Sequence, residues 1–126
     1  MRTAIAALCA AVLAAGCASE VKRVPVDLAA AAPETGRRYV STATVEAKPA
    51  TGYARTIRTG TEFMAMGRVS HGLVLRPIDT VLTLEGAHIH EAYVVHHNGQ
   101  WVGFFLPIER AYSVLPSPVS MPLKEK

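Results

Sequence analysis

The sequence predicts a mainly β protein, in which a small antiparallel sheet or barrel follows a cleaved signal segment and a flexible tether. Three observations lead to this prediction. From residue 39 onward, short runs rich in β-branched and aromatic residues alternate with turn-forming residues, which is typical of strands joined by tight turns. Asn98-Gly99, the pair best suited to a two-residue hairpin turn, stands between two of these runs. The first sixteen residues differ, because one arginine precedes an apolar run.

Residues 1–16 have the three parts of a secretory signal. Arg2 supplies the positive charge, residues 4–15 form an uncharged apolar run, and small residues precede the cleavage point. The run is too short to anchor the chain, because a membrane-spanning helix needs about 20 residues. We therefore expect this segment to be removed. An ordinary signal peptide, cut after Ala15 or Gly16, would leave Cys17 as a plain thiol.

Residues 13–17, with the sequence LAAGC, resemble the lipobox of bacterial lipoproteins. The family usually has Leu, Val or Ile three residues before the cysteine, whereas this chain has Ala14 there and Leu13 one step earlier. The resemblance implies cleavage before Cys17 and lipidation of Cys17 by a diacylglycerol and a further acyl chain such as palmitate. Several acyl chains on one residue hold a protein durably at a membrane.

The residues after Cys17 indicate which membrane the anchor would enter. In enterobacterial lipoproteins an aspartate directly after the cysteine favours retention in the inner membrane, and here Ala18 and Ser19 follow. The resemblance therefore implies a lipoprotein of the outer membrane that faces the periplasm.

The charge and the cysteines exclude several classes of function. The formal net charge is only +3, and the basic residues are scattered, so no nucleic-acid partner is expected. The chain has two cysteines. Cys9 leaves with the signal and Cys17 is blocked by lipid, so we expect no disulfide, redox thiol or cysteine-based metal site in the folded part.

The mature chain divides into three parts. Residues 17–38 hold the lipidated cysteine and a flexible tether, whose alanine run ends at Pro33 without an amphipathic period. Residues 39–115 form the β domain, and residues 116–126 form an extended, proline-rich tail that can lie along it. Candidate strands cover residues 39–45, 53–58, 62–69, 72–76, 79–84, 87–97 and 100–106. A turn of helix over residues 107–112 and a short strand over 113–115 follow them.

The hairpin around Asn98-Gly99 is the clearest local prediction. A two-residue loop places His97 opposite Gln100 and His96 opposite Trp101. Alternation then divides the hairpin into two faces. The expected core face carries Ile89, Tyr93, Val95, Val102, Phe104 and Leu106, and the expected half-wet face carries His88, His90, Ala92, Val94, His96, Trp101 and Phe105. The order of short strands, the Trp after the turn and the helical turn near the end are together similar to bacterial SH3-like domains, which implies a small barrel.

Two residue pairs suggest a copper or zinc site. His88 and His90 would lie about 6.6 Å apart on one face of a strand, close enough to share an ion. Met64 and Met66 repeat this spacing with thioethers, which suit Cu(I). A third ligand would have to come from elsewhere, such as His71 or Glu85. The competing interpretation is that the histidines face solvent and the methionines fill gaps in the core.

No catalytic motif is found. Ser70-His71 invites comparison with a serine hydrolase, but neighbours on a strand point to opposite faces, so the two side chains should not meet. We therefore expect a non-enzymatic envelope accessory factor that binds an envelope protein or peptidoglycan through Trp101 and Phe105. The alternative is a periplasmic metal-binding lipoprotein.

Overall fold

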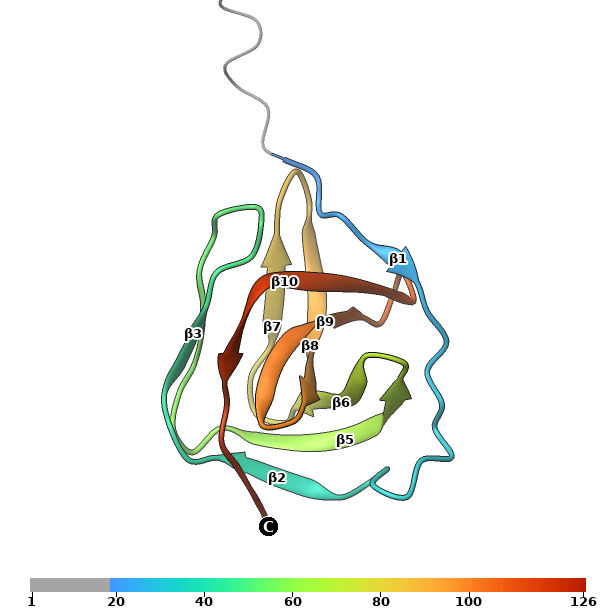
Figure 1. Ribbon diagram of the computed structural model, residues 1–126, viewed down its shortest axis with the longest axis vertical. Helices are drawn as coiled ribbons and strands as arrows, with labels where there is room; N and C mark the ends of the chain where they lie inside the picture. Colours follow the sequence, from blue (N-terminus) through green and yellow to red (C-terminus); the bar gives the residue numbers. More distant parts are fainter. Residues whose placement is uncertain (1–18) are drawn as a thin grey trace, which may run out of the picture.

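The computed structural model describes residues 19–126, which form strands and turns without any helix (Figure 1). The predicted signal segment and Cys17 lie outside the described residues. The strands are β1 (Val24–Pro25), β2 (Arg38–Ser41), β3 (Val45–Ala47), β4 (Arg55–Ile57), β5 (Glu62–Val69), β6 (Gly72–Pro77), β7 (Leu82–Glu85), β8 (Ile89–His97), β9 (Gln100–Leu106), β10 (Ala111–Ser120) and β11 (Leu123–Glu125). In this part of the chain, no helix is long and apolar enough to span a bilayer.

Nine of the strands form one curved antiparallel sheet, and β3 and β4 form a separate hairpin. The strand order is β1-β10-β9-β8-β6-β5-β2-β11, with β7 pairing to the first half of β8. The mainly β, antiparallel prediction is confirmed. The sheet does not close into an SH3-like barrel, because its end strands β1 and β11 do not pair with each other. Both are short, and β1 contains Pro25, which cannot donate a ladder hydrogen bond.

The main hydrophobic core lies on one face of this sheet, which we call the inner face. Its largest fully buried side chain is Trp101, which packs with Phe63 and Phe104. Val45 and Ile57, from β3 and β4, belong to the same core, so the separate hairpin covers the inner face. Burying large apolar side chains on this scale is the dominant stabilising contribution in a domain without disulfides.

The β8–β9 hairpin has the predicted turn but not the predicted faces. Asn98 and Gly99 have φ values of 49° and 75°, and His97 and His96 pair with Gln100 and Trp101 as expected. A bulge then places Val95 opposite Gly103, so that Val102 is the extra residue of β9. The expected half-wet face is in fact the main core face, and it holds Ala92, Val94 and Trp101. Phe104 joins it, whereas Phe105 points to the opposite, outer face.

The segment expected to be a flexible tether is packed against the sheet from Ser19 onward. Val21 is buried in the inner core, and Val24 pairs with Tyr112 of β10. Residues 26–36, here called the strap, then cross the outer face. The strap is held by backbone hydrogen bonds, including Ala29 N to Arg68 O at 2.7 Å and Arg68 N to Ala29 O at 3.0 Å. The tether prediction is wrong for these residues, because backbone pairing needs no apolar pattern in the sequence.

The proline-rich tail is extended, as expected, but it belongs to the domain. Strand β11 pairs with β2, and Leu115 and Met121 are buried in the inner core. The pairing of β10 with β9 is interrupted between Val114 and Val119, where Pro116 and Pro118 lack ladder donors. The boundary predicted at residue 115 therefore does not separate a domain from a tail.

Candidate functional site

The outer face of the sheet carries a second, smaller apolar cluster. Its buried members are Val69, Val74, Val95, Phe105 and Tyr112. Around them lie side chains that are only partly buried, namely Val26, Leu28, Met66, Tyr93 and Val102. The strap therefore covers this face incompletely, and the uncovered part is a cleft.

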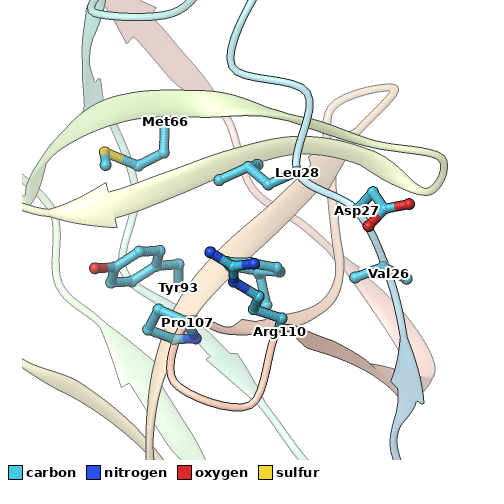
Figure 2. A pocket seen from close by; sticks show the side chains of 8 residues that line it. Val26, Asp27, Leu28, Met66, Tyr93, Pro107 and Arg110 are labelled. Atoms are coloured by element: carbon cyan, nitrogen blue, oxygen red, sulfur yellow. The ribbon is translucent and has the colours of Figure 1, made fainter.

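The cleft has a volume of about 390 Å³. Figure 2 shows the side chains that line it. This volume lies within the range of small-ligand pockets, roughly 300–1,000 Å³. The strap contributes one wall, β5, β8 and β9 form the floor, and the β9–β10 turn closes one side. The lining residues are Val26, Asp27, Leu28, Met66, Tyr93, Phe105, Pro107 and Arg110.

Backbone geometry on both sides of the cleft explains why it stays open. Val26 N donates to Arg110 O at 3.1 Å, and Ala29 bridges to Arg68 of β5. The strap is thus fixed before and after Asp27 and Leu28, and it spans the space between the two fixed points. Its close approach to β5 requires Gly67, since a Cβ there would lie 2.5 Å from Ala29 O. The bulge between Ala65 and Gly67 adds Met66 as the extra residue, which lines the cleft.

The cleft presents opposite charges that do not neutralise each other. Arg110 and Asp27 are exposed, and neither forms an ion pair with any residue from 19 to 126. Figure 2 shows the Arg110 guanidinium lying over the cleft between Tyr93 and Val26, whereas the Asp27 carboxylate points away from it. A guanidinium in this position can bind a carboxylate through two parallel hydrogen bonds.

Tyr93 supplies the second polar group of the cleft. Burial raises the pKa of its phenol, the nearby Glu91 carboxylate raises that pKa further, and Arg76 partly opposes the shift. The phenol therefore stays protonated at neutral pH and can donate a hydrogen bond. Its ring lies 6.2 Å from that of Phe105, at 40° between the planes. The polar residues that line the cleft are Asp27, Tyr93 and Arg110, and its other lining residues are apolar.

Arg110 has a backbone conformation that is unusual for its residue type. It ends the Pro107–Arg110 turn, where a turn of helix was expected, and its φ is 53°. Residues other than glycine, asparagine and aspartate seldom adopt this left-handed region, because the Cβ crowds the backbone. Sequence reasoning missed Arg110, since nothing in its neighbourhood marks that conformation.

A partly buried pair, His90 and Glu109, holds the turn that presents Arg110. His90 is 9% exposed, and its Nδ1 lies 2.7 Å from Oε1 of Glu109. The hydrogen bond from His90 lowers the pKa of the Glu109 carboxyl, although burial opposes this. The two residues are 19 positions apart, so the sequence carries no local signal for the pair. Because Glu109 directly precedes Arg110, the pair fixes one side of the cleft.

The structure separates the two residues predicted to bind a partner. Trp101 has no exposed surface, its Nε1 donates to Gly103 O at 3.0 Å, and its ring meets Phe104 edge-on at 5.3 Å. It is therefore a core residue that no partner can reach in this fold. Phe105 is also buried, but it lines the cleft from the other face of the sheet.

The structure also does not place His88, His90, Met64 and Met66, the residues suggested for a metal site, around one position. Strand β8 begins only at Ile89, so His88 lies exposed in the preceding turn and does not share a strand face with the buried His90. Met64 lies beside Arg76, with Nη2 at 3.9 Å from Sδ, and Met66 lines the cleft. Within residues 19–126, no group of three or more His, Cys, Asp or Glu side chains is placed to hold a metal ion.

Ser70 and His71 do meet, contrary to the expectation for strand neighbours. They form the turn between β5 and β6, and Ser70 Oγ lies 3.3 Å from His71 Nδ1. The imidazole also stacks on Tyr112, with 3.7 Å between ring centroids and 12° between planes. No carboxylate within the described chain is hydrogen-bonded to His71 to orient it as a base.

No protein-family model matches the chain, and neither a curated protein nor a solved structure matches it.

Proposed function

We propose that this chain is a lipid-anchored envelope protein that acts by binding, and that its binding site is the outer-face cleft. Acylated Cys17 would hold it at the outer membrane, facing the periplasm. The cleft would take a segment of an envelope protein or of peptidoglycan. The observation that carries the proposal is an open cleft, lined by apolar and polar side chains, at which Arg110 forms no ion pair with any residue from 19 to 126.

The strained backbone of Arg110 supports a role in binding. A non-glycine residue in the left-handed region costs of the order of 1–3 kcal/mol, and such residues concentrate at functional sites. The structure keeps an arginine in that conformation at the rim of the cleft. The guanidinium of an arginine there can hold an anionic group that enters from solvent.

The lining suggests the chemistry of the ligand. Met66, Phe105 and Leu28 favour an apolar side chain, and Arg110 and the Tyr93 phenol favour a carboxylate next to it. Protein segments and the short peptides of peptidoglycan both offer this combination. The cleft is too small for a folded domain, so an extended segment would have to enter it.

The anchor is tested by metabolic labelling with an alkyne analogue of palmitate, followed by membrane fractionation. The wild-type chain should carry the label and sediment with membranes, and Cys17→Ser should lose both. Cys9→Ser is the matched control, because Cys9 leaves with the signal and its loss should change nothing. Equal labelling of the wild type and Cys17→Ser would contradict the proposed anchor.

The cleft is tested by in-cell crosslinking from a photoreactive amino acid at position 27, in the exposed part of the strap. A crosslinked product is expected there and not with the same group at position 97, at the exposed far end of β8. Arg110→Glu should abolish the product, and Arg58→Glu, at another exposed arginine, should not. A product that persists with Arg110→Glu would rule out the cleft as the binding site.

A further inference from the structure

The described chain starts at one end of the domain and is fixed there. The backbone N–H of Ala87, in the β7–β8 turn, donates to Ser19 O at 3.0 Å. Two residues later, Val21 is buried in the inner core. A Cβ on Gly86 would lie 2.6 Å from Ser19 O and 3.0 Å from Val21 Cγ2, so the turn and the first described residues are in tight contact.

This attachment leaves almost no spacer between the proposed lipid and the fold. Cys17 precedes Ser19 by two residues, and two residues of extended chain reach at most about 7 Å. The polar layer on each side of a bilayer is of similar depth, about 5–7 Å. With the acyl chains of Cys17 inserted in the hydrocarbon, the β7–β8 turn has to lie within or directly on the headgroup layer.

From this geometry we propose that the end of the domain formed by residues 19–23, the β7–β8 turn and the β3–β4 loop rests on the surface of the bilayer. We call this end the N-terminal end. The inference rests on the proposed acylation of Cys17, and it adds an orientation that acylation alone does not define. In Figure 1 the first described residues, the tip of β7–β8 and the loop after β3 lie together at the top of the molecule.

The side chains at the N-terminal end suit a lipid interface. Ile89, the residue after the turn, is 70% exposed, although it is large and apolar. The β3–β4 loop lies beside the turn, because Thr51 Cγ2 would be 3.2 Å from a Cβ on Gly86. That loop carries Tyr53, which is 49% exposed. Tyrosine is favoured at membrane interfaces, where its ring meets the acyl region and its hydroxyl stays in water.

The charges at this end are compatible with anionic lipid. Lys22 and Arg23 are exposed and follow directly on Val21, and basic residues near a membrane attract anionic headgroups. Glu85, next to the turn, is paired with Arg55 at 3.2 Å. Glu20 is exposed in the same segment, so residues 19–23 carry a net charge of +1.

The opposite end of β8 would then point away from the membrane. Eight residue steps separate Ile89 from His97, which is about 26 Å along an extended strand. Val81 precedes β7, about 13 Å from the level of Glu85 and its partner Ile89, and it is 71% exposed. Val81 is therefore a control of matched exposure, and His97 is a more distant one.

The experiment uses the protein purified from bacteria that express the full chain, mixed with vesicles of phosphatidylethanolamine and phosphatidylglycerol. If Cys17 is acylated and Cys9 is removed with the signal, no other thiol is free, so Ile89→Cys, Val81→Cys and His97→Cys each accept a single environment-sensitive fluorophore. We expect nitroxide lipids labelled at the headgroup to quench the probe at position 89 at least threefold more than those at positions 81 and 97. Aqueous iodide should give the reverse order.

The outcomes separate this inference from the anchor on which it rests. Protein that does not float with the vesicles would overturn both the acylation and the membrane-facing end. Protein that floats while iodide reaches all three probes equally would overturn the membrane-facing end and leave the anchor intact. Selective shielding of position 89 would support both.

Discussion

The two faces of the main sheet are built from the same strands but are closed in different ways. The inner face is closed by side chains, since β3–β4, Val21 and the buried residues of the C-terminal segment fill it around Trp101. The outer face is crossed by a strap that backbone hydrogen bonds hold at separate points. Packed side chains leave no space on the inner face, whereas a strap that is fixed only at separate points can leave space beneath it on the outer face. This difference leaves the cleft, and with it Arg110, on the outer face only.

The largest expected effect is the loss of packing on the inner face. Trp101→Ala should lower the free energy of unfolding by about 3–5 kcal/mol, because it empties the centre of a close-packed core. Tyr93→Ala, at the half-buried floor of the cleft, should cost about 1 kcal/mol, a common value for residues outside a tight core. Urea unfolding followed by circular dichroism measures both. Equal losses would mean that the two faces are packed alike.

A smaller effect should follow from lifting the strap. In Gly67→Ala the new methyl meets Ala29 O at 2.5 Å, and overpacking of this kind costs about 1–3 kcal/mol. Amide hydrogen exchange in residues 26–36 should accelerate, while exchange in β9 stays slow. Gly60→Ala is the matched control, because Gly60 also has a positive φ but no atom within 4 Å of the added carbon. Unchanged exchange in the strap would show that Gly67 does not hold it.

The pH dependence of stability should separate the two faces further. Burial lowers the pKa of His96, next to Trp101, although its hydrogen bond to Met121 O opposes the shift. Below the ordinary histidine pKa of 6.5, the unfolded chain binds a proton that folded His96 does not, so the free energy of unfolding falls. The slope from one proton is at most about 1.4 kcal/mol per pH unit, and it ends below the folded-state pKa. His96→Gln should remove this slope.

Glu109, at the rim of the cleft, should act in a separate and more acidic window. Because its pKa is lowered in the fold, the stability that it contributes is present above the ordinary value of 4.5 and is lost as pH falls below that value. In Glu109→Gln the urea midpoint should therefore no longer fall as steeply when the pH drops below 4.5. The fall that His96 causes below pH 6.5 should remain. Loss of the slope between pH 6.5 and 4.5 in Glu109→Gln would contradict this division.

The smallest expected change in stability is at Arg110. Glycine adopts a φ of 53° without strain, so Arg110→Gly should leave the free energy of unfolding unchanged or raise it by up to about 1 kcal/mol. The same substitution should abolish crosslinking from the cleft. A loss of more than about 1 kcal/mol would instead show that the arginine stabilises the fold.

The hairpin shows how far the sequence leads and where it stops. Asn98-Gly99 defines the turn correctly, because both residues tolerate positive φ. Counting alternate residues from that turn assigns Phe104 and Phe105 to the correct faces of the sheet only if the bulge at Val102 is taken into account. A single extra residue exchanges the faces of all residues beyond it. The partner-binding prediction for Trp101 failed for a different reason, because the face of the hairpin that packs on the main core was taken to be half-wet.

The cleft could not be predicted, because its parts come together through the backbone. In the strap only Val26 and Leu28 alternate with exposed residues and pack on the outer face, and its docking also depends on hydrogen bonds from Ala29 and on the missing side chain of Gly67. Both Phe105 and Met66 line the cleft. From the sequence, Phe105 was predicted to bind a partner and Met66 to bind a metal ion. Arg110, which joins them at the cleft, has no local signal. The strand positions were easier to predict, since alternation and turn residues are properties of the local sequence.

Trp101 gives the molecule a spectroscopic property that follows from its position. It is the only tryptophan of the chain, and its indole lies in a dry, apolar environment against Phe104. Its emission should be at short wavelength in the folded state and shift to longer wavelength when the inner core takes up water. A ligand in the outer-face cleft, on the other side of the sheet, should leave that emission unchanged. The chain therefore carries an intrinsic fluorophore that distinguishes loss of the fold from loss of binding.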